Sequence, residues 1–241
     1  MGGARLRRGE ADLGGRPSGL SHSAILERMP PIPQIRSALA NYQPQLVTEG
    51  EARRAAVAMV LRTNPGSDPE VLLIERAEKK GDPWSGHMAF PGGRVDAEDA
   101  SVEYAARRET LEEVGVSLDE AEPLGQLDDL QGRHAGRPSA LVISAFVYHH
   151  PSPGRLIREE KEVRSAFWVP LWNLADPDRH VRRAFRETGS MELPGIIVGE
   201  PDRHVIWGLT YRFIEVFYAA VERPFPNSWG DAQGLAEPTG R

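Results

Sequence analysis

The chain of 241 residues has no cysteine, which excludes disulfides and zinc sites built on thiolates. Its seven histidines are scattered and never form an H-E-x-x-H pattern, so zinc catalysis of that kind is not expected. Positive charge is also scarce, because 29 lysines and arginines stand against 35 aspartates and glutamates, a net charge of −6. The chain therefore lacks the basic footprint of a protein that binds DNA or RNA.

Long apolar segments are absent as well. No apolar run reaches the roughly 18 residues of a membrane-spanning helix, and the N-terminus has no apolar segment typical of a secretory signal. We therefore expect a cytoplasmic protein with neither a membrane nor a nucleic acid as its partner. Hydrophobic residues make up 40% of the chain, an ordinary share for a globular protein with a full core.

Composition divides the chain into three parts. Residues 1–30 are rich in Gly, Arg, Pro and Ser, so we expect a disordered tail there. Residues 35–221 carry apolar periodicity without an internal repeat and form one predicted domain, whereas residues 222–241 are again rich in Pro and Gly and are expected to be loose. The arginines of the first tail would suit an organelle transit peptide, but Glu10 and Asp12 argue against one. A wrongly assigned start codon would give the same composition, so both explanations stay open.

The predicted domain alternates between strand and helix patterns. The predicted strands are residues 53–62, 71–76, 122–128, 140–149 and 166–169, with a hairpin within 183–199. The predicted helices are residues 33–41, 100–114, 170–174 and 207–221. Strands around a central helix, with a second long helix near the end, indicate an α/β sandwich. Asp99 is the predicted N-cap of helix 100–114, and Gly115 is its predicted stop.

Three glutamates on helix 100–114 are the most informative feature. At about 100° per residue, Glu109, Glu112 and Glu113 fall within an arc of roughly 100° on one helix face. Glu109 and Glu113 are like charges at i,i+4 spacing, which costs an isolated helix roughly a few tenths of a kcal/mol. Mg²⁺ binds proteins through such carboxylates. Taken alone, the three glutamates leave a solvated acidic helix face open as the alternative.

The residues around these glutamates resemble the Nudix box. The second half of that motif is Arg-Glu-aliphatic-any-Glu-Glu-any-Gly-aliphatic, and residues 108–116, R-E-T-L-E-E-V-G-V, match it with Thr110 as the one departure. In the first half, Gly93 lies one residue further from the arginine than in the motif. The place of the motif's loop glutamate is shared by Glu98 and Asp99. The motif is long and mixed in residue type, so a chance match is improbable.

The resemblance implies an α/β/α sandwich with a mixed sheet between helices and a metal-assisted hydrolysis of a diphosphate bond. It implies Mg²⁺ or Mn²⁺ as cofactor, with Glu109, Glu112 and Glu113 as the metal-binding set. The backbone carbonyl of Gly92 would be a further ligand. A simple turn is the alternative for Gly92, because a glycine pair also lets the backbone turn tightly.

The same resemblance assigns roles to four other residues. Arg108 would orient a glutamate from the side, with a surface pair to Glu112 as the alternative. The catalytic base stays open between Glu112 and Glu162, a glutamate of the charged loop 155–164 that is otherwise a solvated charge cluster. Arg76 would meet a substrate phosphate, or is a surface arginine at a strand end. Gly93 would let the backbone approach the ions and the substrate.

The stretch before the box is similar to the coenzyme A pyrophosphatase branch of the family. Residues 72–76, L-L-I-E-R, and 86–93, G-H-M-A-F-P-G-G, match much of that branch's signature, with Ile74 in place of Thr and Trp84 in place of His. The resemblance implies hydrolysis of coenzyme A or its thioesters to 3′,5′-ADP and a 4′-phosphopantetheine product. The expected partner is thus a small nucleotide, and a homodimer is a further option because many Nudix enzymes are dimers.

Two other functions stay open at this point. One is a Nudix hydrolase of another nucleoside diphosphate derivative, such as ADP-ribose, a nucleotide sugar or a dinucleoside polyphosphate, which the changes at Ile74 and Trp84 permit. The other is a Nudix-fold binding protein without turnover. The intact glutamates argue against it, because a lapsed site has no reason to keep uncompensated carboxylates.

Overall fold

The computed structural model describes residues 29–48, 53–64, 67–80, 84–134, 137–185, 188–223 and 225, with the side chains of 132–134 and 137–140 excepted. The two predicted tails, 1–30 and 222–241, lie almost wholly outside these residues. Within the described part of the chain, no helix combines the length and the apolarity needed to span a bilayer.

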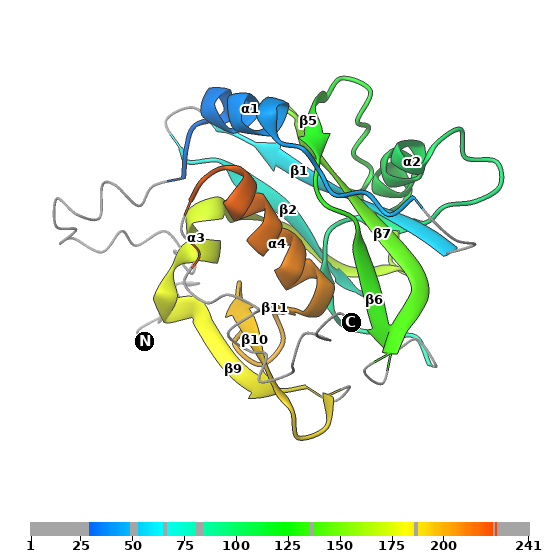
Figure 1. Cartoon of the computed structure of the whole chain (residues 1–241), viewed down its shortest axis with the longest axis vertical. Helices are drawn as coiled ribbons and strands as arrows, with labels where there is room; N and C mark the ends of the chain where they lie inside the picture. The colour runs from blue at the N-terminus through cyan, green and yellow to red at the C-terminus, as the bar shows by residue number, and fades with distance from the viewer. Residues whose placement is uncertain are drawn as a thin grey trace, which may run out of the picture.

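An eight-stranded mixed sheet forms the centre of the molecule (Figure 1). Its strands are β1 (Arg53–Arg62), β2 (Glu70–Arg76), β3 (Met88–Ala89), β4 (Gly92–Arg94), β5 (Glu122–Gln126), β6 (Leu130–His134), β7 (Arg137–His149) and β8 (Val163–Pro170). They follow the order β3-β2-β1-β7-β5, with β4 also on β1, β6 on β7 and β8 on β2. The pair β1–β7 is parallel, and the other pairs are antiparallel.

A smaller antiparallel sheet has the order β11-β10-β9. Its strands are β9 (His180–Ala184), β10 (Glu192–Ile197) and β11 (Val205–Trp207). The hairpin predicted within residues 183–199 is confirmed, because β9 pairs with β10 across a turn at Thr188 and Gly189. This sheet lies against β3 of the main sheet and against α4.

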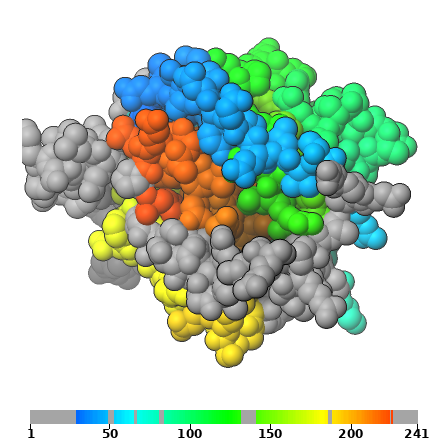
Figure 2. All heavy atoms as spheres, in the orientation of Figure 1, coloured from blue at the N-terminus to red at the C-terminus, as the bar shows by residue number. Residues whose placement is uncertain are grey.

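Helices cover both faces of the main sheet. They are α1 (Ile32–Asn41), α2 (Val102–Val114), α3 (Leu171–Ala175) and α4 (Gly208–Ala220), with a short 3-10 turn, η2 (Pro177–Arg179). α1 and α4 lie next to each other on one face of the molecule (Figure 2), whereas α2 packs on the opposite face of the sheet.

Residues of β1 alternate between two cores. Met59 and Leu61 belong to the core under α1 and α4, whereas Ala58 and Val60 belong to the core under α2. A strand buried on both faces must be apolar along its whole length, which explains the continuous apolar run from which this strand was predicted. The predicted α/β/α sandwich with a mixed sheet is therefore confirmed.

The sequence patterns miss four short strands, β3, β4, β6 and β11. β3 has two residues and β4 and β11 have three, which is too few for an alternating pattern to be recognised. β4 matters most for function, because it contains both glycines of the segment Pro91-Gly92-Gly93, here called the glycine corner. That segment was predicted as a tight turn with a ligand role for the carbonyl of Gly92, and no strand was predicted there.

Candidate metal centre

The helix that carries the three glutamates is fixed at both ends. The hydroxyl of Ser101 accepts a hydrogen bond from the backbone N–H of Tyr104 at 3.0 Å and caps the first turn of α2. The helix ends at Gly115, which has φ 69° and donates its N–H to the carbonyl of Leu111. A side chain is disfavoured at this φ, so the predicted stop at Gly115 is confirmed.

The predicted N-cap at Asp99 is wrong, because its carboxylate is engaged elsewhere. It accepts two hydrogen bonds from Arg108, at 2.8 and 3.0 Å, and one from the backbone N–H of Asp96 at 2.8 Å. The Asp99 side chain is only 2% exposed, whereas Glu98, the other acid of the loop, is exposed. The hydrogen bonds from Arg108 hold the pKa of Asp99 below its ordinary value. Asp99 therefore fixes the arginine.

Arg108 connects the loop before α2 with the glutamates on the helix. One nitrogen, Nη1, lies 3.0 Å from a carboxylate oxygen of Glu109 and 3.1 Å from one of Glu112. The other two nitrogens contact Asp99 and the carbonyl of Arg94. Both alternatives for this arginine are thus present: it pairs with Glu112, and it also reaches Glu109 from the side. That it supports catalysis by orienting Glu109 stays a prediction.

The glycine corner brings backbone against two of the carboxylates. β4 pairs with β1, so that Gly92 lies opposite Val57. The N–H of Gly92 donates to Glu113 at 2.9 Å. A Cβ on Gly93 would lie 2.4 Å from the carboxyl carbon of Glu109, closer than any real contact. The missing side chain at Gly93 therefore makes room for Glu109, whereas the missing side chain at Gly92 lets β4 lie close against β1.

Three carboxylates meet beside this corner. Glu109, Glu113 and Glu162 each offer an oxygen, and these oxygens lie within 4.8 Å of one another. Glu162 comes from the segment before β8, which is held close to the end of α2 by a hydrogen bond from the N–H of Glu159 to the carbonyl of Glu113. Lys79 contacts the Glu162 carboxylate at 3.0 Å. Glu162, predicted as a candidate base, is thus brought to the glutamates of the helix.

The electrostatics of this cluster fit a hard cation. Burial raises the pKa of Glu113 to about 8, and the charges of Glu109 and Glu162 act in the same direction, against the N–H of Gly92 and the charge of Arg76. Burial also raises the pKa of Glu109. Burying neighbouring ionised carboxylates away from water costs free energy unless a proton or a cation neutralises them. Oxygen ligands at this spacing suit Mg²⁺ or Mn²⁺.

Cation binding at this cluster should depend on pH. The pKa of Glu113 is about 8 in the folded chain against an ordinary value of 4.5, so the metal-free protein loses stability as pH rises between these values. A cation needs the ionised carboxylate, so its apparent affinity should rise up to about pH 8. We expect the increase in Tm caused by Mg²⁺ to grow between pH 6 and pH 8. An increase that is the same at every pH would contradict this.

The remaining predicted site residues lie at different distances from the cluster. Glu112 is on the same helix, but its side chain is 54% exposed and its contact is with Arg108, outside the group of three carboxylates. Arg76 lies at the end of β2, close enough for its charge to lower the pKa of Glu113. Metal binding by Glu112 and by the carbonyl of Gly92, and substrate binding by Arg76 and Gly93, stay predictions.

Two contributions to the site were missed in the sequence. Asp99 was considered only as a cap or as the loop acid, and its pairing with Arg108 across nine residues has no periodic signal. Lys79 lies in a polar loop, and its contact with Glu162 spans 83 residues. The pairing of β2 with β8 produces this contact, because it brings Arg76 opposite Val163. Only the sheet register could have predicted it.

Comparison with known proteins identifies the family of this chain. The model of the NUDIX domain matches residues 52–188, more than half of the chain. The uncharacterized protein C14C4.10c of Schizosaccharomyces pombe is 36% identical over 162 residues, which are 60% of this chain and 49% of that protein. The matched region thus spans about half the length of that relative.

Two further similarities were found. The Nudix hydrolase NudL of Citrobacter koseri is 30% identical over 175 residues, or 70% of this chain and 83% of that protein. The solved structure of a MutT/nudix family protein from Enterococcus faecalis is 20% identical with a TM-score of 0.46, over 86% of this chain and 78% of that one. This TM-score is low, so the assignment rests on the sequence matches. From the domain match and the relative in Citrobacter koseri, the chain belongs to the Nudix hydrolase family.

Proposed function

We propose that the chain hydrolyses the diphosphate bond of coenzyme A or its thioesters, using Mg²⁺ or Mn²⁺. The products are 3′,5′-ADP and 4′-phosphopantetheine or its acylated form. The observation that carries the proposal is the group of three carboxylates, Glu109, Glu113 and Glu162, against the glycine corner. A bound cation would supply a Lewis acid for the diphosphate oxygens and lower the pKa of a water molecule.

The choice of coenzyme A is supported by where its signature residues lie. Antiparallel pairing of β2 with β3 brings residues 72–76 beside residues 88–89, and the N–H of Arg76 donates to the carbonyl of His87 at 3.0 Å. Both halves of the signature therefore meet next to the carboxylate group. Ile74, which replaces the usual Thr, is fully buried in the core under α2. This replacement therefore changes a residue of the core.

In the proposed reaction, a water oxygen bonds to one phosphorus of the diphosphate while the bridging P–O bond breaks. The water loses a proton to a base, and the leaving phosphate takes up the negative charge. With Glu109 and Glu113 as ligands of the cation, Glu162 is better placed as that base than Glu112, because its carboxylate lies next to theirs. Arg76 is the positive group next to Glu113 and would attract a substrate phosphate.

The test is a substrate panel with Mg²⁺ and then Mn²⁺, with products resolved by mass. The panel contains coenzyme A, acetyl-coenzyme A, ADP-ribose, diadenosine tetraphosphate and NADH. We expect 3′,5′-ADP from coenzyme A at a rate at least about 10-fold above any other product, since a site built for a substrate's polar groups discriminates by such factors or more.

Each other outcome has a definite meaning. Faster release of a product from ADP-ribose or from a dinucleotide would overturn the choice of coenzyme A and keep the diphosphatase. No turnover of any compound by folded protein with either cation would favour a Nudix-fold binding protein and contradict the proposed activity.

A further inference from the structure

A cleft of about 290 Å³ lies between the end of β2, β8 and the small sheet. This volume is close to the lower end of the roughly 300–1,000 Å³ of small-molecule sites. Its lining includes three arginines from three separate segments, Arg164, Arg183 and Arg203, together with two aromatic residues, Phe185 and Trp207. The three arginines have no role in the metal centre described above.

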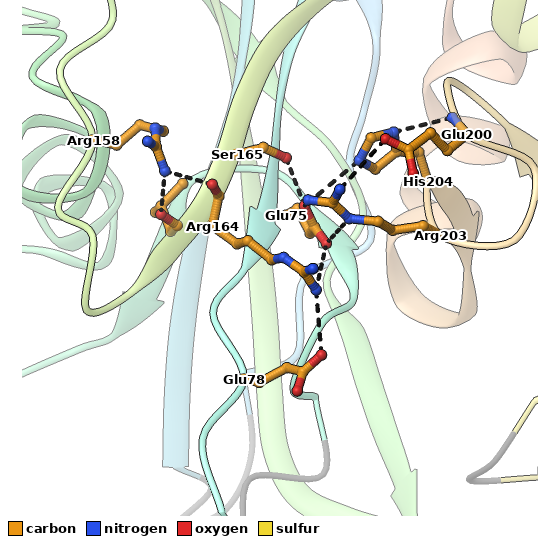
Figure 3. A network of polar contacts seen from close by, with 9 residues as sticks. Glu75, Glu78, Arg158, Arg164, Ser165, Glu200, Arg203 and His204 are labelled. Carbon is orange, nitrogen blue, oxygen red and sulfur yellow. Dashed lines mark hydrogen bonds and ion pairs between the residues drawn. The ribbon is translucent and has the colours of Figure 1, made fainter.

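A buried carboxylate holds two of these arginines in place (Figure 3). Glu75 is 1% exposed and accepts two hydrogen bonds from Arg203, at 2.7 and 2.6 Å, and one from the hydroxyl of Ser165 at 2.7 Å. Arg164 lies 3.5 Å from the same carboxylate. Burial alone would raise the pKa of Glu75, but the hydrogen bonds from Arg203 and Ser165 outweigh it and keep the pKa low. One buried negative charge thus anchors two positive charges.

The other partners of the three arginines are exposed carboxylates. Arg164 lies 3.3 Å from Glu78, and Arg183 lies 3.6 Å from Asp202. Glu78 is 76% exposed and Asp202 is fully exposed, so water screens both pairs and they are weak. Arg203 has a similar exposed partner in Glu200, at 3.4 Å. An anion with several acceptor oxygens can displace such partners, because each guanidinium carries five N–H donors.

An aromatic column orients the third arginine. The guanidinium of Arg183 lies over the ring of Phe185 at 5.4 Å, and Phe185 stacks on Trp207 with centroids 4.2 Å apart and planes at 9°. His87 meets the other side of this column, with its ring edge-on to Trp207 at 4.6 Å. Stacking fixes the plane of a guanidinium and leaves the donors on its edge directed outward, which suits recognition of a phosphate.

The cleft and the carboxylate group meet where the end of β2 pairs with the start of β8. Arg164 of β8 stands two residues after Glu162, which lies in the turn before that strand. A second hollow, of about 280 Å³, shares Glu78 and Arg164 with the cleft and includes Glu160, two residues before Glu162. A substrate with its diphosphate at the carboxylates can therefore extend another part into the cleft.

We propose that Arg164, Arg183 and Arg203 form a subsite for a phosphate monoester on the nucleoside part of the substrate, separate from the diphosphate that is cleaved. In coenzyme A this group is the 3′-phosphate of the ribose, so the identity of the substrate rests on the proposed function. The binding of a phosphate monoester by these arginines does not depend on the proposed function. A phosphate monoester presents three acceptor oxygens and up to two negative charges, which the three guanidinium groups lining this cleft match.

The test compares coenzyme A with 3′-dephospho-coenzyme A, which differ only in this phosphate. For the full chain with Mg²⁺, we expect a KM for coenzyme A that is about 10- to 100-fold lower, the effect of one or two charged hydrogen bonds. Arg183→Ala should raise the KM for coenzyme A toward that of the dephospho compound, with kcat for both little changed. Arg182→Ala is the matched control, because Arg182 is the exposed neighbour on β9 and points to the opposite face.

Failure of this proposal and failure of the proposed function look different. Equal KM values for both compounds in the wild type would overturn the subsite and leave the diphosphatase intact. So would a wild-type preference that Arg183→Ala does not reduce. Arg183→Lys, which keeps the charge and loses the planar fork, replaces the alanine variant should that one not fold, and the same loss of preference is expected.

If neither compound is hydrolysed, the proposed function fails and binding decides the subsite. Isothermal titration of the metal-free protein with 3′,5′-ADP and with 5′-AMP isolates the added phosphate. Tighter binding of 3′,5′-ADP that is lost in Arg183→Ala and kept in Arg182→Ala supports the subsite. Equal affinities for the two nucleotides overturn it.

Discussion

Replacing Glu113 by Gln should lower the rate of diphosphate hydrolysis by about 10³-fold or more, since removing one ligand of a catalytic cation or one charge aimed at the reacting group has effects of this size. Glu113 is the most buried of the three carboxylates and accepts the N–H of Gly92 at 2.9 Å. A glutamine oxygen can accept the same hydrogen bond. The variant should therefore stay folded, with a Tm equal to or above that of the metal-free wild type, because glutamine avoids the cost of burying or protonating a carboxylate there.

The control for this variant is a glutamate on the same helix outside the site. Glu103 accepts a hydrogen bond from the hydroxyl of Tyr148 at 2.7 Å, and Glu103→Gln keeps an acceptor there. The rates of both variants are compared at saturating Mg²⁺ with their thermal melts. Activity of Glu113→Gln within about 10-fold of the wild type, less than a ligand contributes, would show that the carboxylate group is not the metal site.

The local parts of the site could be predicted from the sequence, and the reason is their spacing. Glu109 and Glu113 share a helix, so their common face follows from a period of 3.6 residues alone. The stop at Gly115 follows from the need for a residue that tolerates a positive φ. The strand 53–62 follows from a short apolar run, which a strand buried on both faces requires.

The parts of the site that could not be predicted depend on pairings between distant segments. Glu162 was one of several acids in a charged loop, and backbone hydrogen bonds from Ile157 to Val114 and from Glu159 to Glu113 bring that loop to the helix. The cleft beside it combines residues from β2, β8 and β9 with the segment before β11. No period in the sequence connects Glu75 with Arg203, which lie 128 residues apart. Such contacts follow from sheet register, which local patterns leave undetermined.

The two glycines of the corner should respond differently to the same change. At Gly92, φ is 152° and a Cβ would lie 2.2 Å from the backbone oxygen of Ala56. Gly92→Ala should therefore lower the free energy of unfolding by about 3 kcal/mol or more, because the backbone of β1 cannot move away cheaply. At Gly93 the nearest atoms belong to the carboxyl group of Glu109, the movable end of a side chain. Gly93→Ala should cost little stability.

Gly93→Ala should instead lower the hydrolysis rate by about 100-fold, since displacing a reacting or metal-binding group by about 1 Å has effects of that order. The Mg²⁺ concentration needed for half-maximal activity should also rise. A double-mutant cycle separates this cause from a general disturbance. If the added methyl group acts by moving Glu109, then Gly93→Ala in the background of Glu109→Gln should reduce the rate far less than it does in the wild type. Equal reductions in both backgrounds would mean that the methyl group acts elsewhere, and Gly93 would then have no part in positioning Glu109.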